Sequence, residues 1–84
     1  MNRIKEIRQE KNLSQTDIAK ALGVTRQAIS LYEKGDREPK LETWQKLADF
    51  FGVSVPYLQG ISRVRSPKAY RDYGTFLNTL YSQR

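Results

Sequence analysis

The sequence predicts an all-α protein with five short helices in one compact domain and a sixth helix at the C-terminus. Apolar residues recur every three or four positions, which is typical of helices rather than strands. Residues that can cap a helix start precede several of these stretches, and glycines close them. The links are only two to five residues long, so neighbouring helices must pack against one another.

The first helix is expected over roughly residues 2–11, with Ile4 and Ile7 on its inner face. Ser14 can cap a second helix, and Asp17, three residues later, can complete a capping box. This second helix is expected to stop at Gly23. Its inner face consists of apolar side chains: Ile18, Ala19 and Leu22.

The third helix is expected to start after Thr25 as its N-cap and to run to Lys34, before Gly35 ends it. A polar loop with a proline then leads to a fourth helix, closed by Gly52. The apolar stripe of the fourth helix is Leu41, Trp44, Leu47, Ala48 and Phe51. Because Trp44 belongs to this inward stripe, we expect it in the core rather than on the surface as a stacking platform.

Ser54 can cap a short fifth helix that has Pro56 in its first turn and ends at Gly60. These features predict a domain over residues 1–60 and a basic linker, "ISRVRS", over 61–66. A sixth, amphipathic helix is expected within 67–84, although Gly74 in its middle costs about 1 kcal/mol relative to alanine. Its apolar face consists of Tyr70, Tyr73, Phe76, Leu77, Leu80 and Tyr81.

The composition of the chain limits the classes of function that it can have. The chain has 84 residues and a formal net charge of +6, which invites a nucleic-acid partner. However, residues 1–60 carry ten Lys/Arg against eight Asp/Glu, so most of the excess charge lies in the tail. The chain lacks cysteine and histidine, and it shows no phosphate-binding loop and no clustered carboxylates. We therefore expect neither an enzyme nor a metal or cofactor site. With no long apolar run or signal peptide, a cytoplasmic protein is expected.

The stretch "VTRQAISLYEKG", residues 24–35, has an unusual second face. At about 100° per residue, Ala28, Ile29 and Tyr32 point one way, as an ordinary buried stripe does. The opposite face carries long hydrogen-bonding side chains, a hydroxyl and a leucine: Arg26, Gln27, Ser30, Leu31 and Lys34. In an isolated helix this face would be solvated surface with one exposed leucine.

The two helices around Gly23 form a tight unit. Ala19 is small where they would cross, Gly23 can adopt a positive φ, and Val24 and Ile29 can fill the angle between them. This pattern predicts a helix-turn-helix, whose second helix lies in the major groove of DNA.

The chain also resembles a family. The segments "IKEIRQEKNLSQ", "IAKALGVTRQAIS", "YEKGDREP" and "LADFFGVSVPYL" are similar to the helix-turn-helix family of phage Cro proteins and repressors. The resemblance covers Ile4 to Gly60, about two thirds of the chain. It implies a compact repressor-like DNA-binding domain.

In a helix-turn-helix, the outer face of the helix after Thr25 is expected to contact DNA bases. Arg26 can make two hydrogen bonds to guanine, Gln27 can do so with adenine, and Leu31 can contact a thymine methyl group. Ser30 can donate or accept, so it carries less information.

Five polar residues are expected to contact phosphates: Gln15, Thr25, Lys34, Arg37 and Lys40. The resemblance implies that Gln15 both holds the DNA backbone and supports the first reading residue. Capping alone would equally explain Thr25, and the charged residues of the loop can simply be solvated. The resemblance also implies a partly buried ion pair between Arg8 and Glu33.

One recognition helix touches few base pairs, and members of this family usually bind inverted repeats as dimers. The resemblance implies dimer contacts through the fifth helix, at Pro56, Tyr57 and Leu58. The tail can fold back, cross to a second subunit, or mark the start of a longer chain. We expect a dimer. Two functions follow: a homodimeric DNA-binding transcriptional regulator, most often a repressor in this family, or a protein-interaction module whose tail holds a partner such as a toxin or an anti-repressor.

Overall fold

The computed structural model describes residues 2–69, and within them it contains α-helices and no strand. The five helices are α1 (Ile4–Glu10), α2 (Gln15–Leu22), α3 (Arg26–Lys34), α4 (Leu41–Phe51) and α5 (Val55–Leu58). The all-α prediction is therefore confirmed. Residues 67–69 are helical, at the start of the expected sixth helix. The apolar face of that helix, from Tyr70 to Tyr81, lies outside the described residues.

The predicted caps define the start of α2, α3 and α5. At α2, the Ser14 hydroxyl accepts from the backbone N–H of Asp17 at 3.0 Å, and the Asp17 carboxylate accepts from the Ser14 N–H at 2.9 Å. Thr25 and Ser54 accept in the same way at α3 and α5. Gly23 closes α2 in the left-handed conformation, with φ 71°. A side chain with a β-carbon would be strained at that position.

Two helix ends differ from the prediction. α1 begins at Ile4 rather than at residue 2. The Asn2 side-chain oxygen accepts the Ile4 N–H at 3.1 Å, and so it satisfies a backbone group that has no partner within the helix. α5 ends at Leu58, two residues before Gly60. The Gln59 N–H still bonds the Val55 carbonyl, so the helix unwinds within one turn.

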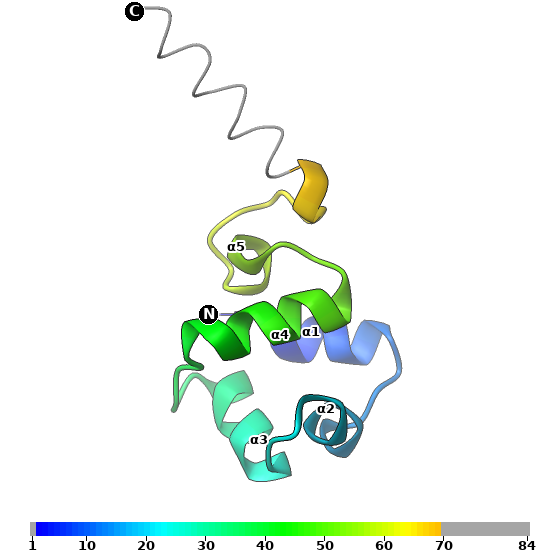
Figure 1. Ribbon diagram of the computed structural model, residues 1–84, viewed down its shortest axis with the longest axis vertical. Helices are drawn as coiled ribbons and strands as arrows, with labels where there is room; N and C mark the ends of the chain where they lie inside the picture. The colour runs from blue at the N-terminus through cyan, green and yellow to red at the C-terminus, as the bar shows by residue number, and fades with distance from the viewer. Residues whose placement is uncertain (1, 70–84) are drawn as a thin grey trace, which may run out of the picture.

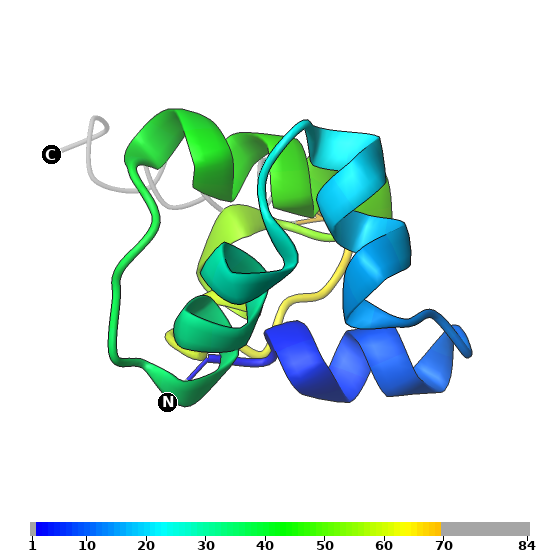
Figure 2. The same cartoon turned by 90° about the horizontal axis from the view of Figure 1, so that it is seen from below.

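The core lies where all five helices meet. α3 packs against both α1 and α2, while α4 packs on α5. Figure 1 shows α2 and α3 at one end of the domain and α5 at the other, and Figure 2, seen from the α2 and α3 end, shows α3 between α1 and α4. Trp44 is 5% exposed, so its predicted place in the core is confirmed. The fully buried large side chains are Ile4, Ile7, Ile18, Ile29, Leu47 and Leu58.

Residues 62–65, within the segment predicted as a linker, lie against the domain, and we call them the strap. The Ser54 N–H donates to the Arg65 carbonyl at 2.8 Å, and the Ser54 hydroxyl donates to the Val64 carbonyl at 2.8 Å. Ser54 thus serves both as the N-cap of α5 and as the anchor of the strap, which explains why this serine is 4% exposed.

Side chains of α1 and its N-cap hold the strap from the other side. Arg3 donates to the Ser62 carbonyl at 2.9 Å and also to the Tyr57 carbonyl. The Arg65 guanidinium pairs with the Glu10 carboxylate, and both arginines lie over the Tyr57 ring. The chain therefore leaves the domain from a defined position beside α5, at the end opposite α2 and α3 (Figure 1).

Candidate nucleic-acid interface

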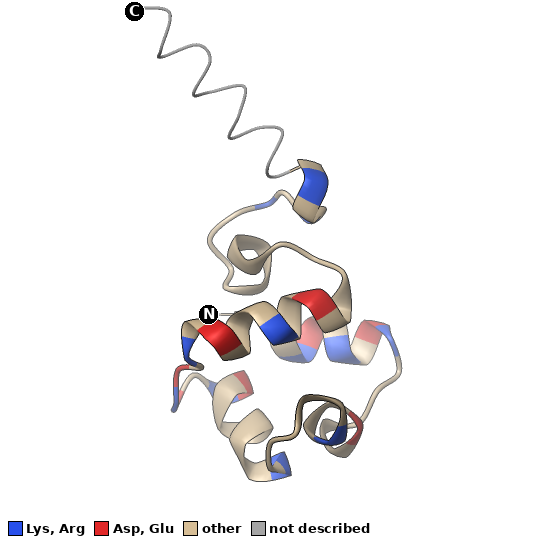
Figure 3. Ribbon diagram, viewed as in Figure 1, with Lys and Arg blue, Asp and Glu red and all other residues tan. Residues whose placement is uncertain are grey.

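α3 separates a buried face from an exposed face as the sequence predicts. Its inner residues, Ala28, Ile29 and Tyr32, are all less than 10% exposed. Arg26 and Gln27 are exposed at its first turn, and Leu31 retains 36% of its surface in solvent. Figure 3 shows basic colour at the free end of α3, where Arg26 is the only charged residue of the first turn, whereas α4 carries both signs of charge. This outer face is available to a partner.

The turn between α2 and α3 brings the two helices into close contact. After the left-handed Gly23, the Val24 N–H donates to the Ala19 carbonyl at 3.0 Å. Ala19 is 4% exposed and Ile29 is fully buried, so small and branched side chains fill the angle between the helices. α3 is therefore packed closely against α2.

Arg8 and Glu33 form an ion pair between α1 and α3. Arg8 donates to the two Glu33 carboxylate oxygens, from Nε at 2.6 Å and from a terminal nitrogen at 3.2 Å. The side chains are only 13% and 4% exposed. A third donation from Arg8, to the Leu13 carbonyl at 3.0 Å, adds the α1–α2 loop to the same network.

Gln15 joins this network. Its side-chain nitrogen lies 3.0 Å from Glu33 Oε1. Because an ionised carboxylate can only accept hydrogen bonds, the NH₂ group of Gln15 must face Glu33. The amide of Gln15 is therefore oriented by α3. It lines a cavity of about 280 Å³ together with Lys5, Ser30, Glu33 and Lys34. Of the four residues expected to read bases, Ser30 therefore shares a cavity with Gln15, whereas Arg26 does not.

The remaining phosphate-contact candidates lie at the ends of α3 and in the loop that leads to α4. The Thr25 hydroxyl accepts the Ala28 N–H at 3.1 Å, so it caps α3. Lys34 is exposed in the last turn of α3. The Arg37 guanidinium lies 5.9 Å from the centre of the Tyr32 ring, and Lys40 precedes α4 without a side-chain cap bond. All four are exposed, and in the chain they come after α2 and before α4.

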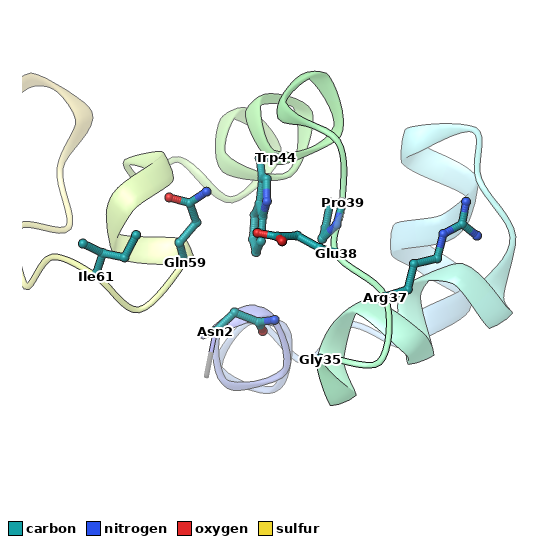
Figure 4. Close-up of a pocket in the computed structure, with 8 residues that line it drawn as sticks. All are labelled: Asn2, Gly35, Arg37, Glu38, Pro39, Trp44, Gln59 and Ile61. Carbon is teal, nitrogen blue, oxygen red and sulfur yellow. The ribbon is translucent and has the colours of Figure 1, made fainter.

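A second cavity, of about 240 Å³, lies beside Trp44 between the α3–α4 loop and the end of α5. The Trp44 indole points into it, while the Arg37 side chain points away from it (Figure 4). Trp44 Nε1 is buried and has no hydrogen-bond partner within residues 2–69. Since none of the outer-face residues of α3 lines this cavity, it is separate from the candidate interface.

The three α5 residues that the resemblance implied for dimer contacts differ in how far they are exposed. Leu58 is fully buried and packs in the core, so its side chain is not available to a second subunit. Pro56 and Tyr57 are half-buried. Ile61, which the sequence reasoning did not single out, lies three residues after α5 and is 78% exposed. The exposure of this single isoleucine in a polar segment could not be predicted from the sequence, because it depends on how the strap packs.

A capped α2, a tight left-handed turn and an exposed face on α3 define the helix-turn-helix class of domain. Comparison with known families supports this directly: residues 4–58 match the Helix-turn-helix family model, of the Cro/C1 type. The match covers more than half of the chain, so the chain belongs to this family. The family is one of transcriptional regulators and not of enzymes.

Curated relatives are similar over the same segment. The cryptic phage CTXphi transcriptional repressor RstR of Vibrio cholerae is 42% identical over 57 residues, which are 68% of this chain and 51% of RstR. The uncharacterized regulator MJ0272 of Methanocaldococcus jannaschii is 48% identical over 54 residues, which are 64% of this chain and 82% of that protein.

A prophage-derived regulator of Bacillus subtilis, YonR, is 45% identical over 56 residues, which are 67% of this chain and 52% of YonR. The matched segment thus spans about half the length of RstR and of YonR. Within residues 2–69, no helix is long and apolar enough to cross a membrane.

Proposed function

We propose that this chain binds double-stranded DNA sequence-specifically and regulates transcription, as a repressor that occupies an inverted-repeat operator as a homodimer. The observation that carries the proposal is the outer face of α3, where Arg26, Gln27 and Leu31 are exposed on a helix whose other face is buried. Membership of the helix-turn-helix family supports it, as does the description of RstR as a phage transcriptional repressor. Such a protein acts in the cytoplasm, with the DNA.

In this proposal α3 lies in the major groove and its first turn reads bases. Arg26 hydrogen-bonds O6 and N7 of a guanine, and Gln27 pairs with N6 and N7 of an adenine. Leu31, one turn later, contacts a thymine methyl group. Its 36% exposure leaves part of the side chain free for such a contact.

Backbone contacts flank the reading residues. Gln15, Thr25 and Lys34 approach phosphates on one side, and Arg37 and Lys40 do so on the other. The exposure of the three basic side chains supports these roles. Phosphate contacts position the domain but carry no sequence information of their own.

Dimerisation supplies the second half-site. One recognition helix reads too few base pairs for tight binding, and a two-fold dimer places two such helices about one turn of DNA apart. We assign the dimer surface to the exposed parts of Pro56 and Tyr57, to Ile61, and to the C-terminal tail. The alternative is that the tail binds a different protein and that DNA binding is secondary.

The test is selection of bound sites from a random duplex library at near-physiological salt. We expect an enriched inverted repeat whose half-sites lie about one helical turn apart. Weak, salt-sensitive binding without enrichment would contradict the proposal. In that case, capture of a partner by the tail would become the leading function.

A further inference from the structure

The cavity lined by Lys5, Gln15, Ser30, Glu33 and Lys34 gathers donors from three helices. Lys5 comes from α1, Gln15 from the first turn of α2, and the other three from the last two turns of α3. Two lysines, a glutamine and a serine thus line one cavity of about 280 Å³, and their side chains carry two ammonium groups, an amide and a hydroxyl. These groups are hydrogen-bond donors that suit an anion with several oxygen acceptors.

The one carboxylate in the lining does not oppose an anion. Glu33 is 4% exposed, and its oxygens accept from Arg8 at 2.6 and 3.2 Å and from Gln15 at 3.0 Å. Its charge is therefore neutralised by Arg8. The two lysines have no carboxylate partner among the ion pairs of residues 2–69. The cavity as a whole is cationic.

The cavity also lies at a suitable distance from the reading residues. Arg26 and Lys34 are eight residues apart on α3, which corresponds to about 12 Å along the helix axis. The major groove is about 8.5 Å deep. With the first turn of α3 at the base edges on the groove floor, a last turn about 12 Å away can reach the level of the sugar–phosphate backbone.

We propose that this cavity is a seat for one DNA phosphate and that Lys5, on α1, is a DNA-contacting residue. We name Lys5, Gln15, Ser30 and Lys34 the phosphate seat. The inference rests on the proposed function and deepens it. It also gives Ser30 a different role from base reading: in the same cavity as Gln15 and the two lysines, its hydroxyl donates to a phosphate oxygen. Glu33 acts as a positioning residue, because it fixes the direction of the Gln15 amide.

The test is the salt dependence of binding by the 84-residue chain to the duplex recovered from the site selection. Each phosphate neutralised contributes about −0.9 to the slope of log K against log salt. We expect Lys5→Gln to make that slope less steep by about 0.9 and to weaken binding equally for every operator variant. Lys46→Gln on α4 is the matched control, since Lys46 is exposed and its Nζ lies 3.6 Å from Glu42. It should leave the slope unchanged.

Ser30→Ala separates the two roles of the hydroxyl. If Ser30 holds a phosphate, the affinity falls by a similar factor for all sequences and the base preferences stay as they are. If one base position relaxes instead, Ser30 reads a base and its place in the seat is wrong. An equal slope for Lys5→Gln and Lys46→Gln would overturn the role of Lys5. Failure of the proposed function would look different, because the wild-type protein itself would then show no sequence preference.

Discussion

Among single residues, Arg26 bears most directly on sequence recognition. Its guanidinium is exposed at the first turn of α3 and can form two hydrogen bonds to one guanine. We expect Arg26→Ala to relax the preference at one base position by about 1–3 kcal/mol. Binding to a set of duplexes, each with one base pair changed, measures this. Arg26→Lys keeps the charge but not the paired geometry, so it should relax the same position. A uniform loss at all positions would instead assign Arg26 to the backbone.

Glu33 should behave as a structural residue. Because it is 4% exposed and accepts three hydrogen bonds, its removal leaves the partly buried Arg8 without a carboxylate partner, with only the Leu13 carbonyl still accepting from it. We expect Glu33→Ala to lower the free energy of unfolding by about 3–5 kcal/mol, as measured by urea denaturation. Replacing both partners, Arg8→Met with Glu33→Leu, should cost less than the single change, because no charge is then stranded. Unchanged melting together with altered base preference would refute this assignment.

At the scale of a helix, the start of α2 should make folding sensitive to acid. The Ser14 backbone N–H, and then its hydroxyl, hold the pKa of Asp17 below its usual value of 3.8. A carboxyl group whose pKa is lowered by folding stabilises the folded state above its unfolded pKa. That stabilisation is lost as the pH falls through the lowered folded value. Hence the wild-type protein should lose stability as the pH drops below about 4.

Asp17→Asn isolates this contribution, since an amide oxygen can still accept the Ser14 N–H but does not titrate in this range. Thermal melting of both proteins between pH 7 and pH 2.5 should show a smaller acid-induced drop for Asp17→Asn. Glu10, whose pKa the Arg65 guanidinium lowers from 4.5, adds a similar drop that Glu10→Gln removes. Identical melting profiles for wild type and Asp17→Asn would show that the cap charge contributes nothing.

The elements predictable from sequence are those whose ends depend on local contacts. Ser14, Thr25 and Ser54 bond backbone groups three residues away, so their spacing was enough to locate α2, α3 and α5. The strap was not predictable. It depends on Arg3 and Ser54 contacting residues 62–65, and the contact from Arg3 to Ser62 joins residues 59 apart in the chain. The spacing of apolar residues in the sequence does not predict a contact between residues so far apart.

The candidate site divides in the same way. The exposed face of α3 follows from helical periodicity alone, and Arg26, Gln27 and Leu31 lie where that periodicity put them. The Gln15 amide, by contrast, is oriented by Glu33 from another helix. Lys5 lines the same cavity although it is ten residues earlier and on α1. Only the packing of three helices brings those side chains together.

For the molecule as a whole, the position of the strap decides how the tail can act. Residues 61–69 lie at the end of the domain opposite α2 and α3 (Figure 1). A tail that starts there can join two subunits without covering the reading face of either. Dimerisation through the tail and DNA binding through α3 are thus sterically compatible, as an inverted-repeat operator requires.

Two truncations test this arrangement. A chain that ends at Ser66 keeps the strap and its bonds to Ser54, so it should fold as the wild type does but become monomeric. Its affinity for the inverted repeat should fall steeply, while a single half-site is bound as by the intact protein. A chain that ends at Gly60 also loses the strap, and should in addition melt at a lower temperature, because the Ser54 N–H loses its acceptor. Sedimentation, melting and binding measured together separate these effects. If the chain ending at Ser66 remains a dimer with full affinity, the dimer surface lies on the domain itself, around Pro56, Tyr57 and Ile61, and the tail is free for another protein.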